Sequence, residues 1–243
     1  MQLQTSTWQE VELYLIRSTG VIIPIGSTEQ HGPTGLIGTD SITAEVIAAR
    51  AGEITGALVA PTIAVGMAEH HMGFPGSMTL RPSTLVSVIC DNVHSLARHG
   101  FTRMLFVNGH GGNIGTVNEA FYEAYATAPA GAAFNCRLVN WYTDRKVAKL
   151  AEELYGDSEG GHATPSEVAV TQAIYPDAIK TASLEPRVAP SGRFYGPEDF
   201  RRRFPDGRIG SDPSLARPEH GEKLMAVSAQ SIADIYAEFL AED

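Results

Sequence analysis

Two acids and one histidine stand close together near the start of the chain, in the stretch PIGSTEQHGPTGLIGTD (residues 24–40). Glu29 and His31 are two positions apart, so their side chains point to the same side of an extended segment. Asp40 follows a loop rich in glycine and proline. A carboxylate oxygen and an imidazole nitrogen suit zinc, manganese or iron. The alternative is a polar turn in which Asp40 caps the next helix, since Asp is a favoured N-cap residue.

A second polar motif, NGHGGN, occupies residues 108–113 directly after an apolar run. Gly111 and Gly112 allow the backbone to turn sharply after His110 and let a ligand approach closely. The helix expected next offers free N–H groups to an anion or a developing oxyanion. The alternative is a tight turn with His110 on the surface, but the composition of the motif favours a functional site.

Two further polar stretches, AEHHMGFPGS and DSEGGHATPSE, carry the remaining candidates. The first contains His71, which either contacts a substrate or supports nearby functional groups. The second contains Glu159, His162 and Glu167. An imidazole with an unperturbed pKa of about 6.5 is suited to moving protons, which makes His162 a candidate acid–base residue. Glu167 has a simpler alternative role as an acid in the first turn of a helix.

Short apolar runs alternate with longer amphipathic stretches along the chain. Strands are expected at residues 20–26, 56–66, 103–109 and 136–142. Helices are expected at residues 41–54, 81–100, 113–127, 145–154, 165–174 and 222–242, with an irregular segment at 186–218. Continuous Val/Ile/Leu strands separated by helices predict a parallel sheet covered on both faces.

The polar motifs all follow expected strands. In open parallel sheets, ligands bind beyond the carboxyl ends of the strands. Five of the eight histidines lie in these four loops, namely His31, His70, His71, His110 and His162. This coincidence is stronger support for a shared site than any one residue provides.

Composition narrows the class of protein. A net charge of −10 argues against nucleic-acid binding, which usually needs a basic face. Hydrophobic residues make up 43% and charged residues 19% of the 243 residues, as in ordinary soluble proteins with a sizeable core. The start of the sequence lacks the features of a signal peptide, and no apolar run is long enough to span a membrane. Two distant cysteines fit a reducing compartment, so we expect a cytoplasmic protein without membrane partners.

Together, the motifs resemble those of the creatininase (creatinine amidohydrolase) family. The matching pieces are PIGSTEQHGPTGLIGTD, AEHHMGFPGSMTL, VNGHGGN and GGHATPSEVA, in the family's order. The resemblance implies one domain over residues 1–243 with a three-layer α/β/α sandwich and a mostly parallel central sheet. It also implies a homo-oligomer, often a hexamer.

The same resemblance implies a centre of two divalent cations, with zinc as the first candidate and manganese or iron as alternatives. Its ligands would be Glu29, His31, Asp40 as the bridging acid, His110 and Glu167. In creatininase proper a metal-binding Glu stands two positions after the NGH histidine, where this chain has Gly112. Glu167 is therefore expected to replace it.

The function implied is hydrolysis of a C–N bond in a small, possibly cyclic, amide by a metal-activated water. His162 would carry the proton to the leaving nitrogen, with Glu159 orienting it. His71, Gly111 and Gly112 would contact the substrate.

Creatinine is one candidate substrate. Relatives that deformylate formamidopyrimidines or cleave a peptide provide alternatives. A metal-binding scaffold without catalysis is the rival from another class. A nucleotide-binding protein is disfavoured, because the chain lacks G-x-G-x-x-G and the Walker pattern.

Overall fold

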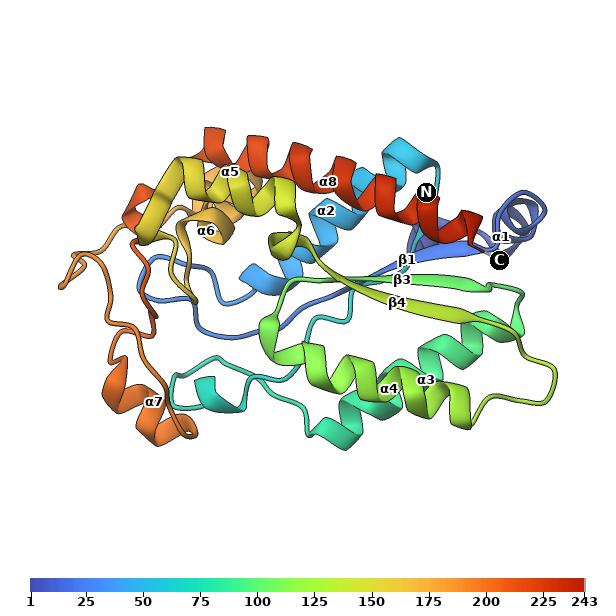
Figure 1. Cartoon of the computed structure of the whole chain (residues 1–243), viewed down its shortest axis with the longest axis horizontal. Coiled ribbons are helices and arrows are strands. Elements are labelled where there is room, and N and C mark those ends of the chain that lie inside the picture. The colour runs from blue at the N-terminus through green and yellow to red at the C-terminus, as the bar shows by residue number, and fades with distance from the viewer. Residues whose placement is uncertain (243) are drawn as a thin grey trace.

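The computed structural model describes residues 1–242 of the chain. Within these residues, four parallel strands form one sheet in the order β2–β1–β3–β4 (Figure 1). The strands are β1 (Gly20–Ile25), β2 (Leu58–Val59), β3 (Arg103–Asn108) and β4 (Asn135–Asn140).

Helices cover both faces of this sheet, which confirms the predicted three-layer α/β/α sandwich. One face carries α2 (Thr39–Thr55), α5 (Arg145–Tyr155), α6 (Pro165–Ile174) and α8 (Pro218–Ala241) (Figure 1). The other face carries α3 (Pro82–Arg98) and α4 (Ile114–Ala126). Two shorter helices, α1 (Trp8–Leu15) and α7 (Pro197–Arg203), lie toward opposite ends of the molecule.

Strands β1 and β2, and β3 between Met104 and Val107, are apolar because both of their faces are buried, whereas β4 is only partly buried. Ile22 and Leu105 pack into the core beneath α2, α5, α6 and α8. Their neighbours Ile23 and Phe106 pack into the separate core beneath α3 and α4. Successive residues of a strand point to opposite faces, so one sheet supplies the apolar side chains of two cores.

Two elements differ from the sequence-based expectation. The strand expected at 56–66 is regular only over Leu58–Val59, and Ile63 makes an isolated bridge to Ile25. Pro61 stands between these two pieces, and proline has no N–H to donate to a sheet. The segment 186–218, expected to be irregular, contains α7.

The start of the chain holds a helix that the apolar pattern did not predict. Thr7 and Glu10 form a capping box at the start of α1, which satisfies two backbone N–H groups. The last helix, α8, starts with Pro218 at N1, four residues before the expected start. No helix in the described residues 1–242 combines the length and the apolar character needed to cross a membrane.

Strand register brings the polar loops together. Asn108 at the end of β3 pairs with Ile25 at the end of β1 and with Asn140 at the end of β4. These three strands therefore end at one edge of the sheet, and the loops that follow them start side by side.

Candidate active site

The candidate site lies where α2, the first helix after β1, approaches the end of β3. The N-cap of α2 is Gly38, so Asp40 lies inside the first turn and does not cap the helix. A Cβ on Gly109 would lie 2.1 Å from the backbone oxygen of Asp40. Glycine at this position therefore permits the close approach that delivers Asp40 to the strand ends.

Asp40 lies between two imidazole rings. Its Oδ1 is 3.0 Å from His31 Nε2, and its Oδ2 is 3.1 Å from His110 Nδ1. The other nitrogen of each ring is a donor, because His31 Nδ1 donates to the Glu29 carbonyl and His110 Nε2 to the Met67 carbonyl. The nitrogens that face Asp40 then carry lone pairs unless a proton is added. A proton or a cation is needed between them and the carboxylate.

Glu29 is fully buried beside this arrangement. Its Oε2 accepts a hydrogen bond from Ser27 Oγ at 2.8 Å and lies 3.3 Å from His110 Nε2. Its Oε1 accepts no aligned hydrogen bond from any group in residues 1–242, although His71 Nε2 approaches it to 3.0 Å. The same holds for Asp40 Oδ2, so two buried carboxylate oxygens lack a hydrogen-bond donor. Such oxygens fit a divalent cation.

Glu167 approaches the cluster from α6. It belongs to the capping box of this helix, in which its Oε1 accepts from Thr164 N at 2.6 Å. The same oxygen lies 3.8 Å from His31 Nε2. The structure therefore brings all five predicted metal ligands to one place, with Glu167 serving the helix start as well. Ligand atoms of Glu29, His31 and Asp40 lie within 4.8 Å of one another.

The charges of these groups depend on their neighbours. Burial, and then the Asp40 carboxylate, raises the pKa of Glu29 to about 7. Burial lowers the pKa of His31, but the carboxylates of Asp40 and Glu167 outweigh it and raise that pKa to about 10. Burial also disfavours ionised Asp40, yet His31 and His110 hold its pKa well below the usual range. The cluster thus holds positive charge against its carboxylates, as a metal site must.

His162 reaches the cluster from the loop before α6. Its Nε2 is 2.8 Å from the backbone oxygen of Gln30, and its Nδ1 is 3.9 Å from Glu29 Oε1. Burial, and then the neighbouring His31, lowers the pKa of His162 well below its ordinary value, so the ring is neutral. The backbone of residue 30 therefore orients His162.

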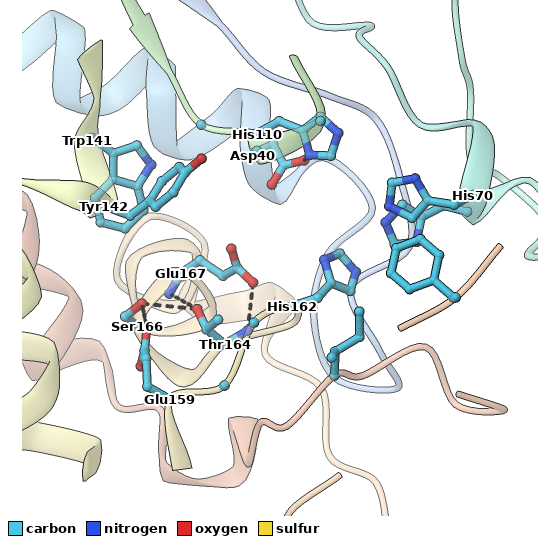
Figure 2. Close-up of a pocket in the computed structure, with 18 residues that line it drawn as sticks. Asp40, His70, His110, Trp141, Tyr142, Glu159, His162, Thr164, Ser166 and Glu167 are labelled. Atoms are coloured by element: carbon cyan, nitrogen blue, oxygen red, sulfur yellow. Dashed lines mark hydrogen bonds and ion pairs between the residues drawn. The ribbon is translucent and has the colours of Figure 1, made fainter. Parts of the chain in front are cut away.

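Glu159 does not orient His162, contrary to the sequence-based expectation. Within the described part of the chain, no hydrogen bond or ion pair joins these two side chains. Glu159 Oε1 instead accepts from Ser166 Oγ, and Thr164 Oγ1 lies 3.0 Å from that hydroxyl. Ser166 and Thr164 lie at the start of α6 beside Glu159 (Figure 2).

A cavity of about 420 Å³ opens over the cluster. Its lining includes Gly111 and Gly112 together with Asp40, His110, His162 and Glu167. It also includes Trp141 and Tyr142 (Figure 2). Trp141 Nε1 and Tyr142 Oη are buried donors without a partner in residues 1–242.

Comparison with known proteins identifies the family to which this fold belongs. The model of the family described as "Creatininase: Creatinine amidohydrolase" matches residues 4–236. The chain belongs to the creatininase family. It is 30% identical over 223 residues to the mycofactocin precursor peptide peptidase of Mycolicibacterium smegmatis, covering 88% of this chain and 83% of that relative. It is 28% identical over 247 residues to the creatinine amidohydrolase of Pseudomonas putida, covering 96% of this chain and 94% of that enzyme.

Solved structures of creatininase share the fold. A manganese form superposes with a TM-score of 0.82 at 26% identity, covering 99% of both chains. A variant of the Zn–Zn type superposes with a TM-score of 0.79 at 26% identity, covering 99% of this chain and 98% of that chain. The creatininase family and these relatives are hydrolytic enzymes, and this protein is a hydrolase. The zinc and manganese forms, with the buried His/Glu cluster, support divalent-metal binding.

The position where creatininase proper carries a Glu is closed to any side chain in this creatininase-family member. A Cβ on Gly112 would lie 2.4 Å from His110 Nε2 and 2.6 Å from the Met67 carbonyl. His110 would have to move before a residue with a side chain could fit. Glu167 reaches the cluster by another route, from the start of α6.

Three residues of the site were missed by the sequence analysis. Gln30 lies inside the E-Q-H motif, between two predicted ligands. Trp141 and Tyr142 directly follow β4, so the rule that sites form at strand ends pointed to their location.

Proposed function

We propose that this hydrolase cleaves a C–N bond of a small amide, as creatinine amidohydrolase does. Two divalent cations would be held by Glu29, His31, Asp40, His110 and Glu167, with Asp40 between them. The main support for the proposal is the position of Asp40, since each of its two carboxylate oxygens faces an imidazole nitrogen beneath the cavity. When bound, such cations lower the pKa of water and polarise a carbonyl oxygen. Zinc is the first candidate, followed by manganese and iron.

His162 is the candidate for proton transfer. Its Nε2 lies 2.8 Å from the Gln30 backbone oxygen, and its Nδ1 lies on the side of the cluster, 3.9 Å from Glu29 Oε1. A neutral imidazole in this position accepts a proton from the attacking water and delivers it to the leaving nitrogen. This transfer is needed because an amide anion is a very poor leaving group.

The substrate would be held by the opposite wall and by the glycine turn. Tyr142 Oη and Trp141 Nε1 would donate hydrogen bonds to an acceptor oxygen of the substrate. Gly111 and Gly112 leave room for the amide close to His110. Tyr142 points into the cavity toward Asp40 and His110 in Figure 2, which supports this role.

A peptide is the second candidate substrate. The chain is slightly more similar to a mycofactocin precursor peptide peptidase, at 30% identity, than to a creatinine amidohydrolase, at 28%. Both reactions break a C–N bond of an amide, so the same residues serve either one. Formamidopyrimidines remain a third class that the same chemistry would deformylate.

The test is a metal and substrate screen. Metal-free protein would be reconstituted with zinc, manganese or iron, and assayed with creatinine, short peptides, a formamidopyrimidine and small cyclic amides. We expect about two metal ions per chain and metal-dependent release of an amine from one substrate class. Protein that binds none of these metals and gains no activity from them would refute the proposal. Full metal binding without turnover of any C–N substrate would favour the scaffold alternative.

We also propose that the chain, as a single domain, forms a homo-oligomer. Trp8, Leu13 and Ile16 on α1 are 67%, 65% and 83% exposed, which is unusual for large apolar side chains. Size-exclusion chromatography with light scattering would measure the mass, and a hexamer is the expected result. A monomer at micromolar concentration would contradict it.

A further inference from the structure

Arg208 is a fully buried cation that lies outside the four polar motifs of the site. It belongs to residues 186–212, a segment that we call the strap, which lies at the end of the molecule that carries α7 (Figure 1). Phe194 and Ile209 of the strap line the cavity. A buried guanidinium is costly unless its charge and its N–H groups are satisfied, so its partners show which segments it holds together.

Every nitrogen of the Arg208 guanidinium has an acceptor within the strap. Its Nε donates to Asp206 Oδ2 at 2.9 Å, and its Nη2 donates to the Pro186 carbonyl at 2.8 Å. Its Nη1 donates to the carbonyls of Arg187 and Ser211, at 2.7 and 3.1 Å. Because the strap starts at Pro186 and Ser211 lies next to its other end, one planar group joins the two ends of the segment.

The part of the strap around Arg208 is hydrogen-bonded to the loop that carries His162. The Ile209 carbonyl accepts from Gly161 N–H at 2.8 Å and from His162 N–H at 3.3 Å. Ile209 N–H donates in return to the His162 carbonyl at 3.3 Å, which makes an antiparallel bridge. Ser211 Oγ donates to the same His162 carbonyl at 2.7 Å. The backbone of His162 is therefore held by the strap.

The position of this backbone determines how closely the His162 ring approaches the candidate metal cluster. His162 Nδ1 lies 3.9 Å from Glu29 Oε1, and the ring centroid lies 4.6 Å from that of His31. Within residues 1–242, Arg208 makes no hydrogen bond or ion pair with any of the five proposed metal ligands. Any effect of Arg208 on the cluster must therefore pass through the strap.

We infer that Arg208 is a positioning residue, which holds the strap in the conformation that keeps His162 beside the metal cluster. It acts as a fixed set of hydrogen-bond donors. The consequence for turnover rests on the proposed function. The position of the loop does not, and it can be measured without a substrate.

The primary test is hydrogen exchange of backbone amides in the full chain. Arg208→Met retains an apolar stem but removes the donors from the carbonyls of the strap. We expect the Gly161 amide to exchange about 10-fold faster than in the wild type, because its hydrogen bond to Ile209 opens more often. The Leu105 amide in β3 should change less. Arg202→Met, at an exposed position of the strap, is the matched control and should alter neither amide.

Two results would overturn the inference. An unchanged Gly161 amide in Arg208→Met would show that the guanidinium does not hold the loop. An equal acceleration at Gly161 and Leu105 would show that it supports the stability of the whole fold and has no particular effect on the loop.

Ser211→Ala is a second variant that tests the same connection if Arg208→Met does not fold. It removes only the hydroxyl that donates to the His162 carbonyl. The Gly161 amide should again exchange faster, by a smaller factor than in Arg208→Met. The exposed Ser87→Ala, in α3, is the matched control and should leave the exchange unchanged. Wild-type exchange of Gly161 in Ser211→Ala would contradict the role of the strap.

Turnover and zinc content separate this role from a purely structural one. The assay uses zinc-loaded Arg208→Met and the substrate found among creatinine, short peptides, formamidopyrimidines and cyclic amides. We expect kcat to fall by about 10²-fold, because misplacing a reacting group by about 1 Å has an effect of this size. Zinc content and KM should change much less. Lost zinc, or a change confined to KM, would overturn the inference. If exchange behaves as expected but no C–N substrate is found, the proposed function fails alone.

Discussion

Two walls of one cavity contain acids in contrasting surroundings: Asp40 is buried and Glu159 is half-buried. At the ends of β1 and β3, Asp40 faces the imidazoles of His31 and His110 at 3.0 and 3.1 Å. On the opposite wall, Glu159 faces the Ser166 hydroxyl and no imidazole within residues 1–242. Both acids lie on the cavity surface.

The contrast shows that the neighbours decide the charge of a buried acid. Burial alone would raise the pKa of both groups. For Asp40 the two imidazoles reverse this effect and hold its pKa well below the usual range. For Glu159 the Ser166 hydrogen bond offsets burial only in part, and its pKa rises to about 7. The wall at the ends of β1 and β3 therefore carries an ionised acid, Asp40, which suits cations. The opposite wall carries Glu159, which is neutral below about pH 7.

The largest effect is expected from removing the negative charge of Asp40. Asp40→Asn keeps the shape of the side chain but removes the charge between His31 and His110. We expect loss of bound metal and a fall in turnover larger than the roughly 10–100-fold typical of an indirect partner. Metal analysis and an amide hydrolysis assay measure both. The exposed Asp91→Asn is the matched control. Full metal content in Asp40→Asn would contradict the role of Asp40 in holding cations.

A smaller loss is expected from His162, the candidate for proton transfer. His162→Ala should retain metal and lose turnover by about 10²–10⁴-fold, the usual contribution of acid–base catalysis. The assay is metal content together with kcat, and His99→Ala, on an exposed site, serves as control. Loss of metal would make His162 a ligand, while unchanged kcat would remove it from proton transfer.

The smallest effect concerns stability rather than activity. The pKa of Glu159 is raised from 4.5 to about 7, so the folded state holds this proton more tightly than the unfolded state. The resulting stability is complete below pH 4.5 and is lost as the pH rises through about 7. Glu159→Gln cannot ionise and avoids this loss. Metal-free Glu159→Gln should therefore match the wild type near pH 4 and exceed it by on the order of 2 kcal/mol at pH 8.

Urea unfolding at several pH values measures this difference. The exposed Glu152→Gln is the matched control and should follow the wild type at every pH. Equal pH dependence in Glu159→Gln and the wild type would show that the second wall does not hold a proton.

Much of the fold was predictable because it depends on local patterns. The apolar runs at β1 and β3 have the length and composition of buried strands, and Pro82 marks the start of α3. The second strand was overestimated, because an apolar composition does not reveal where Pro61 interrupts pairing. The capping box at Thr7 was overlooked, and with it α1.

The sequence by itself determined which groups are available to the site and where along the chain they lie. Glu29, His31, Asp40 and His110 follow strand ends, and parallel strands in register end at one edge of the sheet. Spacing also placed His162 and Glu167 on the loop and helix start that follow β4 and α5.

Only the tertiary structure decided what each side chain faces. In the described part of the chain, Glu159 accepts a hydrogen bond from Ser166 and makes none to His162. Gln30 contacts His71, which is 41 residues away in the chain, and His162, which is 132 residues away. These hydrogen bonds join segments that are distant in the chain, and their direction depends on where packing places each backbone carbonyl and N–H. No local spacing encodes that placement, so the hydrogen-bond partners and charges of the site follow from the fold as a whole.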